Sequence, residues 1–526
     1  MFKLLKYRFC KYKHSVIALK CFNLIRKKLY FKINTSDNPD VLVECILRTP
    51  KSTIEKLIIS SYLLRSTKAK NVAVYFKHSR LKSNSNYEIT KSFGVNNFYS
   101  IELGLLNPLL WIKFLFCFFS SLKNISSSEN ILKFHLKGVY IGDLLYDTIV
   151  RDNSKHYNFQ NVSYLTKLKY YGQAIFLFFL NKNIWGKSDF KYLITSHKTY
   201  LRYGLLVRIA LDSGATVILK DNNVFKLYDQ NVNILEHFLK PKKEQVLSTL
   251  ENAEKLNASK AYLKNRFSGQ LDQMDVVNAF KGKNLYSREK LKESIGVSHS
   301  NKPIVFIMSH AISDSPHSSE YLHFNDYYDW LKCTLVECCK NENVIFVVKE
   351  HPSSYFWNES GVVQSIITDM SLRNIYILPT DFNTSGFVEC ADLILTAQGT
   401  VALESVAFKI PVITCGAGYF SSLGAIDETV SKEHYLNLIK GLSISSIGKM
   451  KNDITEVKMD KACVILYLVS LNQCHSNLVY ETNILPNQDF HTEQELLWKY
   501  IYSQLNEYDI EQDPLSINCD GLFNGR

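Results

Sequence analysis

A small polar turn with the sequence TAQGT stands directly before an apolar helical segment that carries one acid, Glu404. The turn contains Thr396, Gln398, Gly399 and Thr400. A helix that begins near Thr400 exposes unpaired backbone N–H groups and a positive dipole end, and Gly399 lets a ligand approach the backbone closely. This pattern predicts a phosphate site, with Glu404 accepting hydrogen bonds from ribose hydroxyls. A plainer interpretation stays open, in which Thr400 caps the helix and Glu404 is a solvated acid.

A histidine-proline pair, His351 and Pro352, follows the apolar run NVIFVVKE. The proline favours an extended conformation at His351, which we expect to aim the imidazole into the ligand cleft. A histidine at such a place donates a hydrogen bond to a phosphate or diphosphate oxygen and offsets the charge of a leaving group. A loop histidine with no such role is a common alternative. The pair gains meaning because it lies one strand-helix unit before the glycine turn.

The elements that would position these residues alternate between strand and helix in the second half of the chain. The expected strands lie in PIVFIMSH (303–310), NVIFVVKEHP (343–352), NIYILP (374–379), ADLILTAQGT (391–400) and IPVITCGAG (410–418). Such an alternation predicts an α/β fold with a parallel, doubly wound sheet. Ligands of these sheets lie beyond the carboxyl ends of the strands, which is where His310, His351 and Thr396 fall.

The first half of the chain predicts a second sheet. NVAVYF (71–76) and KYLITSH (191–197) read as strands, and the latter is followed by a helical pattern and the strand ATVIL (215–219), which together form a βαβ unit. We therefore expect two Rossmann-like domains with a ligand cleft between them. The expected parts are a basic amphipathic arm (1–39), an N-terminal domain (40–220), a strandless helical connection (221–300), a C-terminal domain (301–440) and a helical region with a weakly ordered acidic tail (441–526).

Composition and charge indicate a globular protein with a basic N-terminal arm. The 526 residues are 46% hydrophobic and 21% charged, with a net charge of +12. Residues 1–33 hold ten of the bases and no acid, so the arm could lie on an anionic membrane surface or pack as an ordinary basic helix. The greasiest stretch, residues 105–119, contains Asn107, Pro108 and Lys113 and is shorter than the about 20 residues of a membrane span. A buried helix, or one dipping into the membrane interface, fits it better.

Other classes of protein and site receive little support. The twelve cysteines are scattered without a CxxC pair, which favours reduced thiols in a cytosolic protein over zinc or disulfides. No signal peptide is recognisable, and outside the arm bases and acids nearly balance, so nucleic-acid binding is not indicated.

Three stretches, IVFIMSHAISDSPHSSEYLHFNDYYDWL, VVKEHPSS and LTAQGTVALESVAFKIPVITCGAGYFSSLGAIDET, resemble bacterial surface and capsular polysaccharide biosynthesis proteins of the GT-B glycosyltransferase type. That grouping includes the capsule Kdo transferases and related CMP-sugar enzymes. GVYIGDLLYDT and ITSHKTYLRYGLLVRIALDSGATV in the first half are similar to segments of the same proteins. The resemblance covers residues 135–220 and 300–440.

The resemblance implies a C-terminal domain that binds a nucleotide sugar, the co-substrate, and an N-terminal domain that offers the acceptor. It assigns His351 and Pro352 to the donor phosphate, Gly399 and Thr400 to the phosphate turn, and Glu404 to the ribose. Related CMP-sugar enzymes often carry paired serines where this chain has Gly399-Thr400, so CMP, UDP and GDP all stay open. No further cofactor is implied, and the resemblance implies metal-independent chemistry.

An inverting transferase needs a base for the acceptor hydroxyl, whereas a retaining one can lack it. The candidates are Asp143 and Asp147 in IGDLLYDT, His197 in TSH, and Asp314 with His310. Asp143 could equally cap a helix, and His197 could be a buried strand-end residue.

The predicted function is transfer of a sugar from a nucleotide sugar to a surface polysaccharide, either capsular or O-antigen, on a glycan or lipid-linked acceptor. We expect a cytoplasmic protein, with peripheral attachment to the inner face of the membrane as an open alternative. Two rival functions remain: a nucleotide-sugar epimerase of GT-B architecture, and a non-catalytic polysaccharide assembly or export factor.

Overall fold

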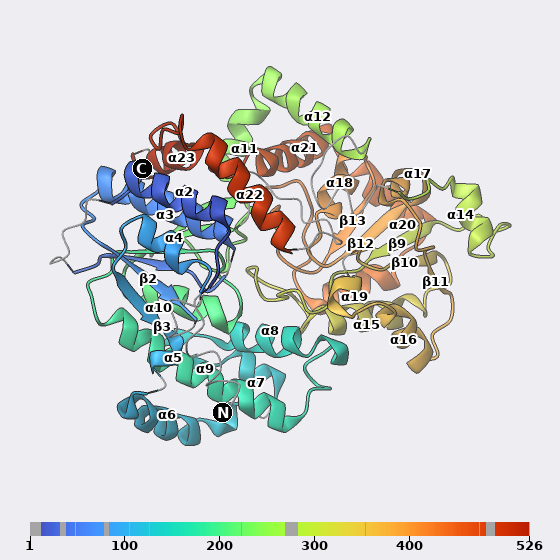
Figure 1. Ribbon diagram of the computed structural model, residues 1–526. Coiled ribbons are helices and arrows are strands. Elements are labelled where there is room, and N and C mark those ends of the chain that lie inside the picture. The colour runs from blue at the N-terminus through green and yellow to red at the C-terminus, as the bar shows by residue number, and fades with distance from the viewer. Residues whose placement is uncertain are drawn as a thin grey trace. The chain divides into compact units, whose positions relative to one another are not determined.

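The computed structural model describes residues 12–524 apart from 32–37, 48, 78–83, 105, 126, 222–223, 269–281, 353, 473 and 480–489. The chain divides into two compact units, shown as ribbons in Figure 1. Unit 1 comprises residues 1–145, 168–234 and 472–526, and unit 2 comprises residues 146–167 and 235–471. Both are α/β units with parallel, Rossmann-like sheets.

Unit 1 contains a six-stranded sheet in the order β3-β2-β1-β6-β7-β8. Its strands are β1 (Val41–Glu44), β2 (Val72–Phe76), β3 (Asn97–Ser100), β6 (Tyr192–Thr195), β7 (Thr216–Asp221) and β8 (Val224–Tyr228). All neighbours are parallel except β7 and β8. The strand order reverses between β1 and β6, and β1 is buried along its whole length, as expected for a central parallel strand with helices on both faces.

The strand β8 corrects the expectation of a strandless connection after residue 220. It pairs antiparallel with β7, with Val217 opposite Tyr228 and Asp221 opposite Val224. Four of its five residues are buried, because pairing with β7 extends the sheet over apolar side chains. The sequence VFKLY is too short and too mixed for its own pattern to separate a strand from a helix end.

Helices cover the sheet of unit 1. The first and the last of them correct the expectations about the basic arm and the acidic tail. The helices are α2 (Val16–Lys28), α3 (Pro50–Ser66), α4 (Tyr87–Ser92), α5 (Ile101–Gly104), α6 (Pro108–Ser120), α7 (Ser128–Leu132), α8 (Gly142–Asp152), α9 (Tyr164–Trp185), α10 (Leu205–Asp212), α22 (Phe490–Gln504) and α23 (Pro514–Asn524), with α8 and α9 running into unit 2. A hairpin of β4 (His135–Leu136) and β5 (Val139–Tyr140) lies between α7 and α8.

The basic arm is a packed helix over the part that the structure describes. In α2, Cys21, Phe22 and Ile25 are buried in the same core as Trp498 of α22. Ser15 caps α2 by accepting from the backbone N–H of Ala18. The acidic tail is ordered over its described part, up to residue 524, since α23 contributes two fully buried residues to this core. Residues 1–11 of the arm lie outside the described range.

Unit 2 contains a five-stranded parallel sheet in the order β11-β10-β9-β12-β13. Its strands are β9 (Ile304–Met308), β10 (Ile345–Lys349), β11 (Ile375–Ile377), β12 (Leu393–Thr396) and β13 (Val412–Thr414), all within the runs that the sequence predicted. Every residue of β9, β10 and β12 is buried, which explains their unbroken apolar sequence. The order reverses between β9 and β12, and open parallel sheets bind ligands at such a reversal.

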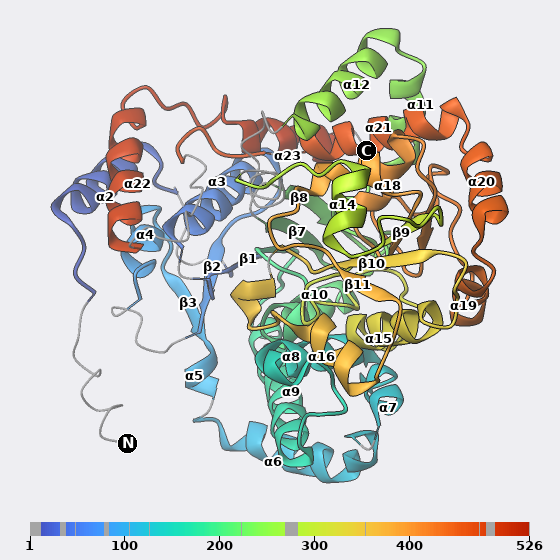
Figure 2. The same cartoon turned by 90° about the vertical axis from the view of Figure 1, so that its right-hand side faces the viewer.

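Helices pack on both faces of the unit 2 sheet (Figure 2). The helices are α11 (Lys243–Leu250), α12 (Ala253–Phe267), α14 (Arg288–Ser294), α15 (Tyr327–Cys338), α16 (Val362–Asp369), α17 (Phe387–Cys390), α18 (Val401–Ala407), α19 (Lys432–Lys440), α20 (Ile444–Asn452) and α21 (Glu456–Leu471). One face is covered by α15, α16 and α19, the other by α14 and α17. No helix in the described parts of the chain has both the length and the apolar character to cross a bilayer.

Candidate functional site

Two loops at the carboxyl edge of the unit 2 sheet are joined through His310, which follows β9. Its Nε2 atom accepts a hydrogen bond from the backbone N–H of Gln398 at 3.1 Å and lies 3.3 Å from Oγ1 of Thr396. Both partners belong to the end of β12, so the contact lies where the strand order reverses. This is the place at which open parallel sheets bind ligands.

The short distances between the TAQGT turn and His310 require a glycine at position 399. A Cβ atom at Gly399 would lie 2.9 Å from Oγ1 of Thr396 and 3.6 Å from Nε2 of His310. Any side chain there would push the threonine hydroxyl aside and cover the turn, whereas glycine leaves the backbone open to a ligand. The structure thus brings together four of the predicted residues: His310, Thr396, Gln398 and Gly399.

The hydrogen bond from Gln398 fixes the protonation of His310. Because Nε2 accepts a backbone N–H, the neutral ring carries its proton on Nδ1. The ring stacks on Tyr327 with centroids 4.4 Å apart, and burial, helped by the neighbouring His351, lowers the pKa of His310 to about 3. His310 is therefore a neutral hydrogen-bonding group at physiological pH, and it is poorly suited to take a proton from an acceptor.

A group of basic side chains lies at the end of β10. Lys349 is only 8% exposed. Burial, followed by the nearby charge of Lys283, lowers the pKa of the Lys349 amine to about 8. Burial makes the charged form of this amine costly, so an anion that pairs with it would be favoured.

His351 belongs to the same basic group. Burial lowers its pKa to about 4, with Lys349 and Lys283 adding to the effect and Asp314 opposing it. The loop that carries it is held by Glu350, whose carboxylate accepts the backbone N–H of Gly361 at 3.1 Å. Pro352 follows in a turn and is half-buried. His351 is thus a neutral donor beside two lysines.

Glu359 holds the loop that carries Asp314. This buried carboxylate accepts the backbone N–H groups of Ile312 at 2.7 Å and of Ser313 at 2.9 Å. The loop presents Asp314 to solvent with its side chain 57% exposed, 3.7 Å from Arg151. Asp314 is therefore accessible, and its charge is screened by both Arg151 and water.

The surroundings of Thr400 and Glu404 differ from those expected of a helix cap and a solvated acid. Thr400 precedes the seven-residue helix α18 and makes no side-chain cap. Glu404 is buried rather than solvated, and its Oε1 accepts a hydrogen bond from Nε of Arg266 at 2.8 Å. Arg266 is itself buried on α12. The pair links α18 to α12, so a ribose bound by Glu404 would have to share the carboxylate with Arg266.

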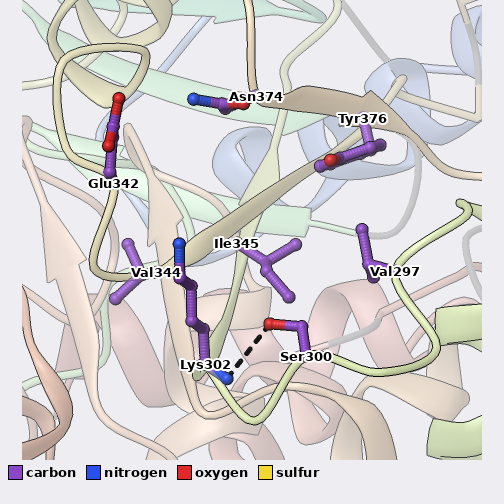
Figure 3. A pocket seen from close by; sticks show the side chains of 8 residues that line it. All are labelled: Val297, Ser300, Lys302, Glu342, Val344, Ile345, Asn374 and Tyr376. Carbon is purple, nitrogen blue, oxygen red and sulfur yellow. Dashed lines mark hydrogen bonds between the residues drawn. The ribbon is translucent and has the colours of Figure 1, made fainter.

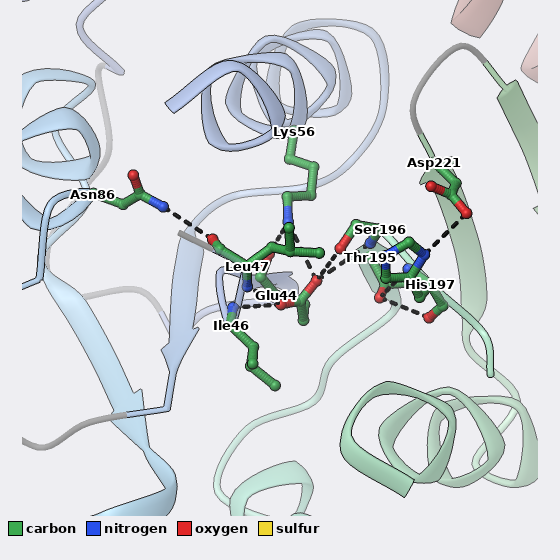
Figure 4. A network of polar contacts seen from close by, with 9 residues as sticks. All are labelled: Glu44, Ile46, Leu47, Lys56, Asn86, Thr195, Ser196, His197 and Asp221. Carbon is green, nitrogen blue, oxygen red and sulfur yellow. Dashed lines mark hydrogen bonds and ion pairs between the residues drawn. The ribbon is translucent and has the colours of Figure 1, made fainter. Parts of the chain in front are cut away.

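The carboxyl edge of the unit 1 sheet carries a second polar cluster, again where the strand order reverses (Figure 4). Glu44, at the end of β1, is fully buried and forms an ion pair with Lys56 of α3 at 3.2 Å. Its Oε2 also accepts the hydroxyl of Ser196, which follows β6, at 2.8 Å. Burial opposes ionisation of Glu44, but Lys56 and Ser196 prevail and lower its pKa. The cluster fixes the loop that leads to the next residue, His197.

His197 lies at the rim of this cluster and is paired with Asp221. Nδ1 of His197 is 2.9 Å from Oδ2 of Asp221, and the imidazole is 31% exposed. Burial lowers the pKa of His197, but the hydrogen bond and charge of Asp221, together with Glu44, raise it above its ordinary value. A histidine oriented by a carboxylate through Nδ1 presents Nε2 as a base. Of the candidate bases, His197 has the geometry of a proton acceptor.

The remaining two candidates are held in buried pairs. Asp143 of α8 forms an ion pair with Arg208 of α10, and both side chains are at least nine-tenths buried. Asp147, further along α8, lies 2.6 Å from Nδ1 of His317, with both in unit 2. Buried pairs of this kind fix elements in place, and neither carboxylate faces solvent.

A cavity of about 280 Å³ lies at the opposite, amino edge of the unit 2 sheet (Figure 3). Val344 and Ile345 at the start of β10 line it, together with Lys302, whose backbone N–H donates to Ser300. It contains none of the predicted site residues. Ligands of parallel sheets bind at the carboxyl edge, so we do not place the site in this cavity.

Several residues of these clusters escaped sequence reasoning. Lys349 is part of the KEHP run, yet nothing in the sequence marks it as buried. Asp221 and Glu44 end strands, and that position was the available signal. Glu359 and Arg266 come from elsewhere in unit 2 and reach the site region only through the fold.

No family model matches the chain, and no curated protein matches it. Solved structures that align with it include KpsC from Thermosulfurimonas dismutans, a beta Kdo 2,4 transferase, at 12% identity over 53% of this chain and 88% of that one, with a TM-score of 0.31. UDP-GlcNAc 2-epimerase from Neisseria meningitidis aligns at 11% identity over 82% and 100% of the chains, with a TM-score of 0.26. The spinosyn rhamnosyltransferase SpnG aligns at 10% over 82% and 95%, with a TM-score of 0.23. These scores are low, so the function has to be argued from the chain's own residues.

Proposed function

We propose that this protein is a glycosyltransferase that takes a sugar from a nucleotide-sugar donor and attaches it to a hydroxyl of a surface polysaccharide or its lipid-linked precursor. The observation that carries the proposal is the contact between His310 and the TAQGT turn at the reversal point of the unit 2 sheet, beside the buried amine of Lys349. An anionic ligand at this edge meets a glycine turn, two histidines and a lysine. Nucleoside diphosphates and nucleoside monophosphates have the charge and size for such a site.

Donor binding is assigned to the residues that follow β9, β10 and β12. The Lys349 ammonium pairs with a phosphate oxygen, which offsets the penalty of its buried charge. His351 donates a hydrogen bond to the same group, and the open backbone at Gly399 permits close approach. His310 keeps the turn in place through Gln398.

These groups act most strongly as the glycosidic bond breaks. The bond between the anomeric carbon and the donor phosphate oxygen gives its electrons to that oxygen, so negative charge grows on the phosphate. A desolvated lysine and histidine at fixed positions stabilise this charge more than they stabilise the ground state. The residues proposed here need no metal ion for this task.

Acceptor activation is assigned to His197 in unit 1. Its Nε2 takes a proton from the acceptor hydroxyl, and Asp221 stabilises the imidazolium that forms. The Glu44–Ser196 hydrogen bond holds the loop that carries His197. A base of this kind suits inversion at the anomeric carbon.

The proposal is tested with the purified full chain in two steps. A thermal-shift screen against CMP-, UDP- and GDP-sugars should show stabilisation by donors of one nucleotide, because binding to the native state alone raises the melting temperature. NMR analysis of that donor incubated without any acceptor then separates the rival epimerase, which converts the sugar, from a transferase, which leaves it unchanged apart from slow hydrolysis. A protein that binds no nucleotide sugar would fit the assembly or export factor instead.

A further inference from the structure

The helix α6 has two apolar faces, and only one of them is used in packing. Trp111 and Phe118 contact Phe176 and Tyr171 of α9, with ring centroids 4.9 Å and 6.1 Å apart. Figure 1 and Figure 2 both show α6 beside α9 at the margin of unit 1. Asn107 caps the helix and Pro108 opens it, so its start is well defined.

The opposite face of α6 is an apolar stripe open to solvent. Leu109, Ile112, Phe116 and Phe119 recur at helical spacing and are between 63% and 80% exposed. Single exposed apolar residues are ordinary, but four large ones in a row on a helix mark an interaction surface. The expectation of a buried helix over residues 105–119 therefore fails for this face, and the interfacial alternative fits.

The length of α6 and the charges near it indicate what binds to this stripe. Thirteen residues rise about 20 Å, which is too short to span the about 30 Å of hydrocarbon but suits a helix lying along it. From residue 106 to residue 128 the sequence holds two lysines and no acid. Lys113 lies next to the stripe, one turn from Leu109 and Phe116, and Lys169 of α9 is exposed. Aromatic and aliphatic side chains flanked by lysines match an anionic lipid surface.

A second copy of the chain fits the stripe less well. In a two-fold contact centred on the stripe, Lys113 of each copy would face its counterpart within an apolar interface that has no acid on α6 to pair with it. We infer that α6 is a membrane-docking helix that inserts Leu109, Ile112, Phe116 and Phe119 among the lipids of an anionic bilayer. This inference does not depend on the proposed glycosyl transfer.

The test is cosedimentation of the full chain with vesicles of phosphatidylcholine alone and of phosphatidylcholine mixed with phosphatidylglycerol. We expect binding to the mixed vesicles. Replacing two stripe residues, Ile112→Ser with Phe116→Ser, should lower the partition coefficient at least about tenfold. The matched control, Ile444→Ser with Val457→Ser, removes two exposed apolar side chains from unit 2 and should leave binding unchanged. Circular dichroism and melting temperature should be the same for all variants.

Three results would overturn the inference. One is no binding of the parent protein to either vesicle. Another is binding that survives the α6 substitutions but is lost on deletion of residues 1–11, which would assign the membrane contact to the arm. A third is concentration-dependent dimerisation, seen by analytical ultracentrifugation, that the α6 substitutions abolish, because a second copy would then cover the stripe. In Lys113→Gln, binding to mixed vesicles that falls toward the weaker level seen with neutral vesicles would support the charge argument.

Discussion

Nε2 of His310 and the backbone nitrogen of Gln398 lie 3.1 Å apart, which ties the loop after β9 to the loop after β12. These strands are neighbours in the sheet although 84 residues separate the ends of β9 and the start of β12. The contact commits His310 to a neutral state and to a structural task, and it leaves phosphate chemistry to His351 and Lys349. The predictions below follow from this division of roles.

His351→Ala should reduce kcat and kcat/KM together, by about 100- to 1,000-fold, with little change in donor affinity. The reason is that a donor aimed at the leaving phosphate acts mainly on charge that develops as the bond breaks. Steady-state kinetics with the donor identified by the binding screen measures this effect. His299→Ala, at an exposed histidine of unit 2, is the control. A folded His351→Ala enzyme within about threefold of the parent would show that His351 is only a loop residue.

Lys349→Met should stabilise the free protein and weaken donor binding. The pKa of Lys349 is lowered to about 8, so the unfolded chain binds more protons between about pH 8 and pH 10.5 and the stability of the parent rises with pH across this window. Below about pH 8 the buried charge carries its full penalty, and methionine removes it, which should raise Tm by several degrees. Calorimetric thermal unfolding at neutral pH, with Lys451→Met as the exposed control, measures the change.

The same lysine predicts a proton uptake. A bound phosphate restores the pKa of Lys349 toward its ordinary value, so at about pH 9 donor binding should draw close to one proton from the buffer in the parent and less in Lys349→Met. Titration calorimetry in buffers of different ionisation enthalpy gives the number of protons taken up on binding. Equal uptake in both proteins would place the phosphate away from Lys349.

Asp221→Asn should lower the pKa of His197 and move the acid limb of the kcat/KM profile to lower pH, while reducing the maximal rate by about 10- to 100-fold. The stabilising effect of the raised pKa is present below the ordinary histidine value and is lost as pH rises through the folded one, so the variant should lose more stability at about pH 5 than at about pH 8. Rate profiles and melting curves across this range are the measurements. An unchanged acid limb would mean that another group takes the acceptor proton.

Much of the fold could be predicted because the central strands of both sheets are parallel and buried. The strands β9 and β10 lie in apolar runs, and such runs are recognisable in the sequence as buried strands. The strand β8 could not be predicted in this way, because it becomes a strand only by pairing with β7. The arm was ambiguous for the same reason, since the residues that bury α2 come from α22, nearly 500 residues away.

The places of the candidate residues in the fold could be predicted, whereas their surroundings could not. Strand ends located His310, His351 and the TAQGT turn, because the carboxyl edge of a parallel sheet is fixed by topology. Protonation and pairing depend on neighbours that are distant in sequence. Glu404 illustrates this: its spacing suggested a solvated or ribose-binding acid, and only the fold reveals Arg266 beside it.

Glu404→Ala should destabilise unit 2, because it removes the carboxylate that pairs with the buried guanidinium of Arg266. Breaking one side of a buried pair typically costs about 3–5 kcal/mol. The double variant Glu404→Ala with Arg266→Met should recover part of the loss, which chemical denaturation of the three proteins would show. Titration calorimetry of Glu404→Gln with the donor tests the ribose role separately, since a weaker affinity at unchanged stability would support it.

Titration calorimetry of the parent protein, Lys349→Met and Lys451→Met with CMP-, UDP- and GDP-sugars tests the central claim most directly. We predict that sugars of one nucleotide bind the parent and Lys451→Met alike, and that Lys349→Met binds them at least about tenfold more weakly while melting at a higher temperature. Equal donor affinity in all three proteins, or no binding of any nucleotide sugar to the folded parent, would contradict a donor site at the carboxyl edge of the unit 2 sheet.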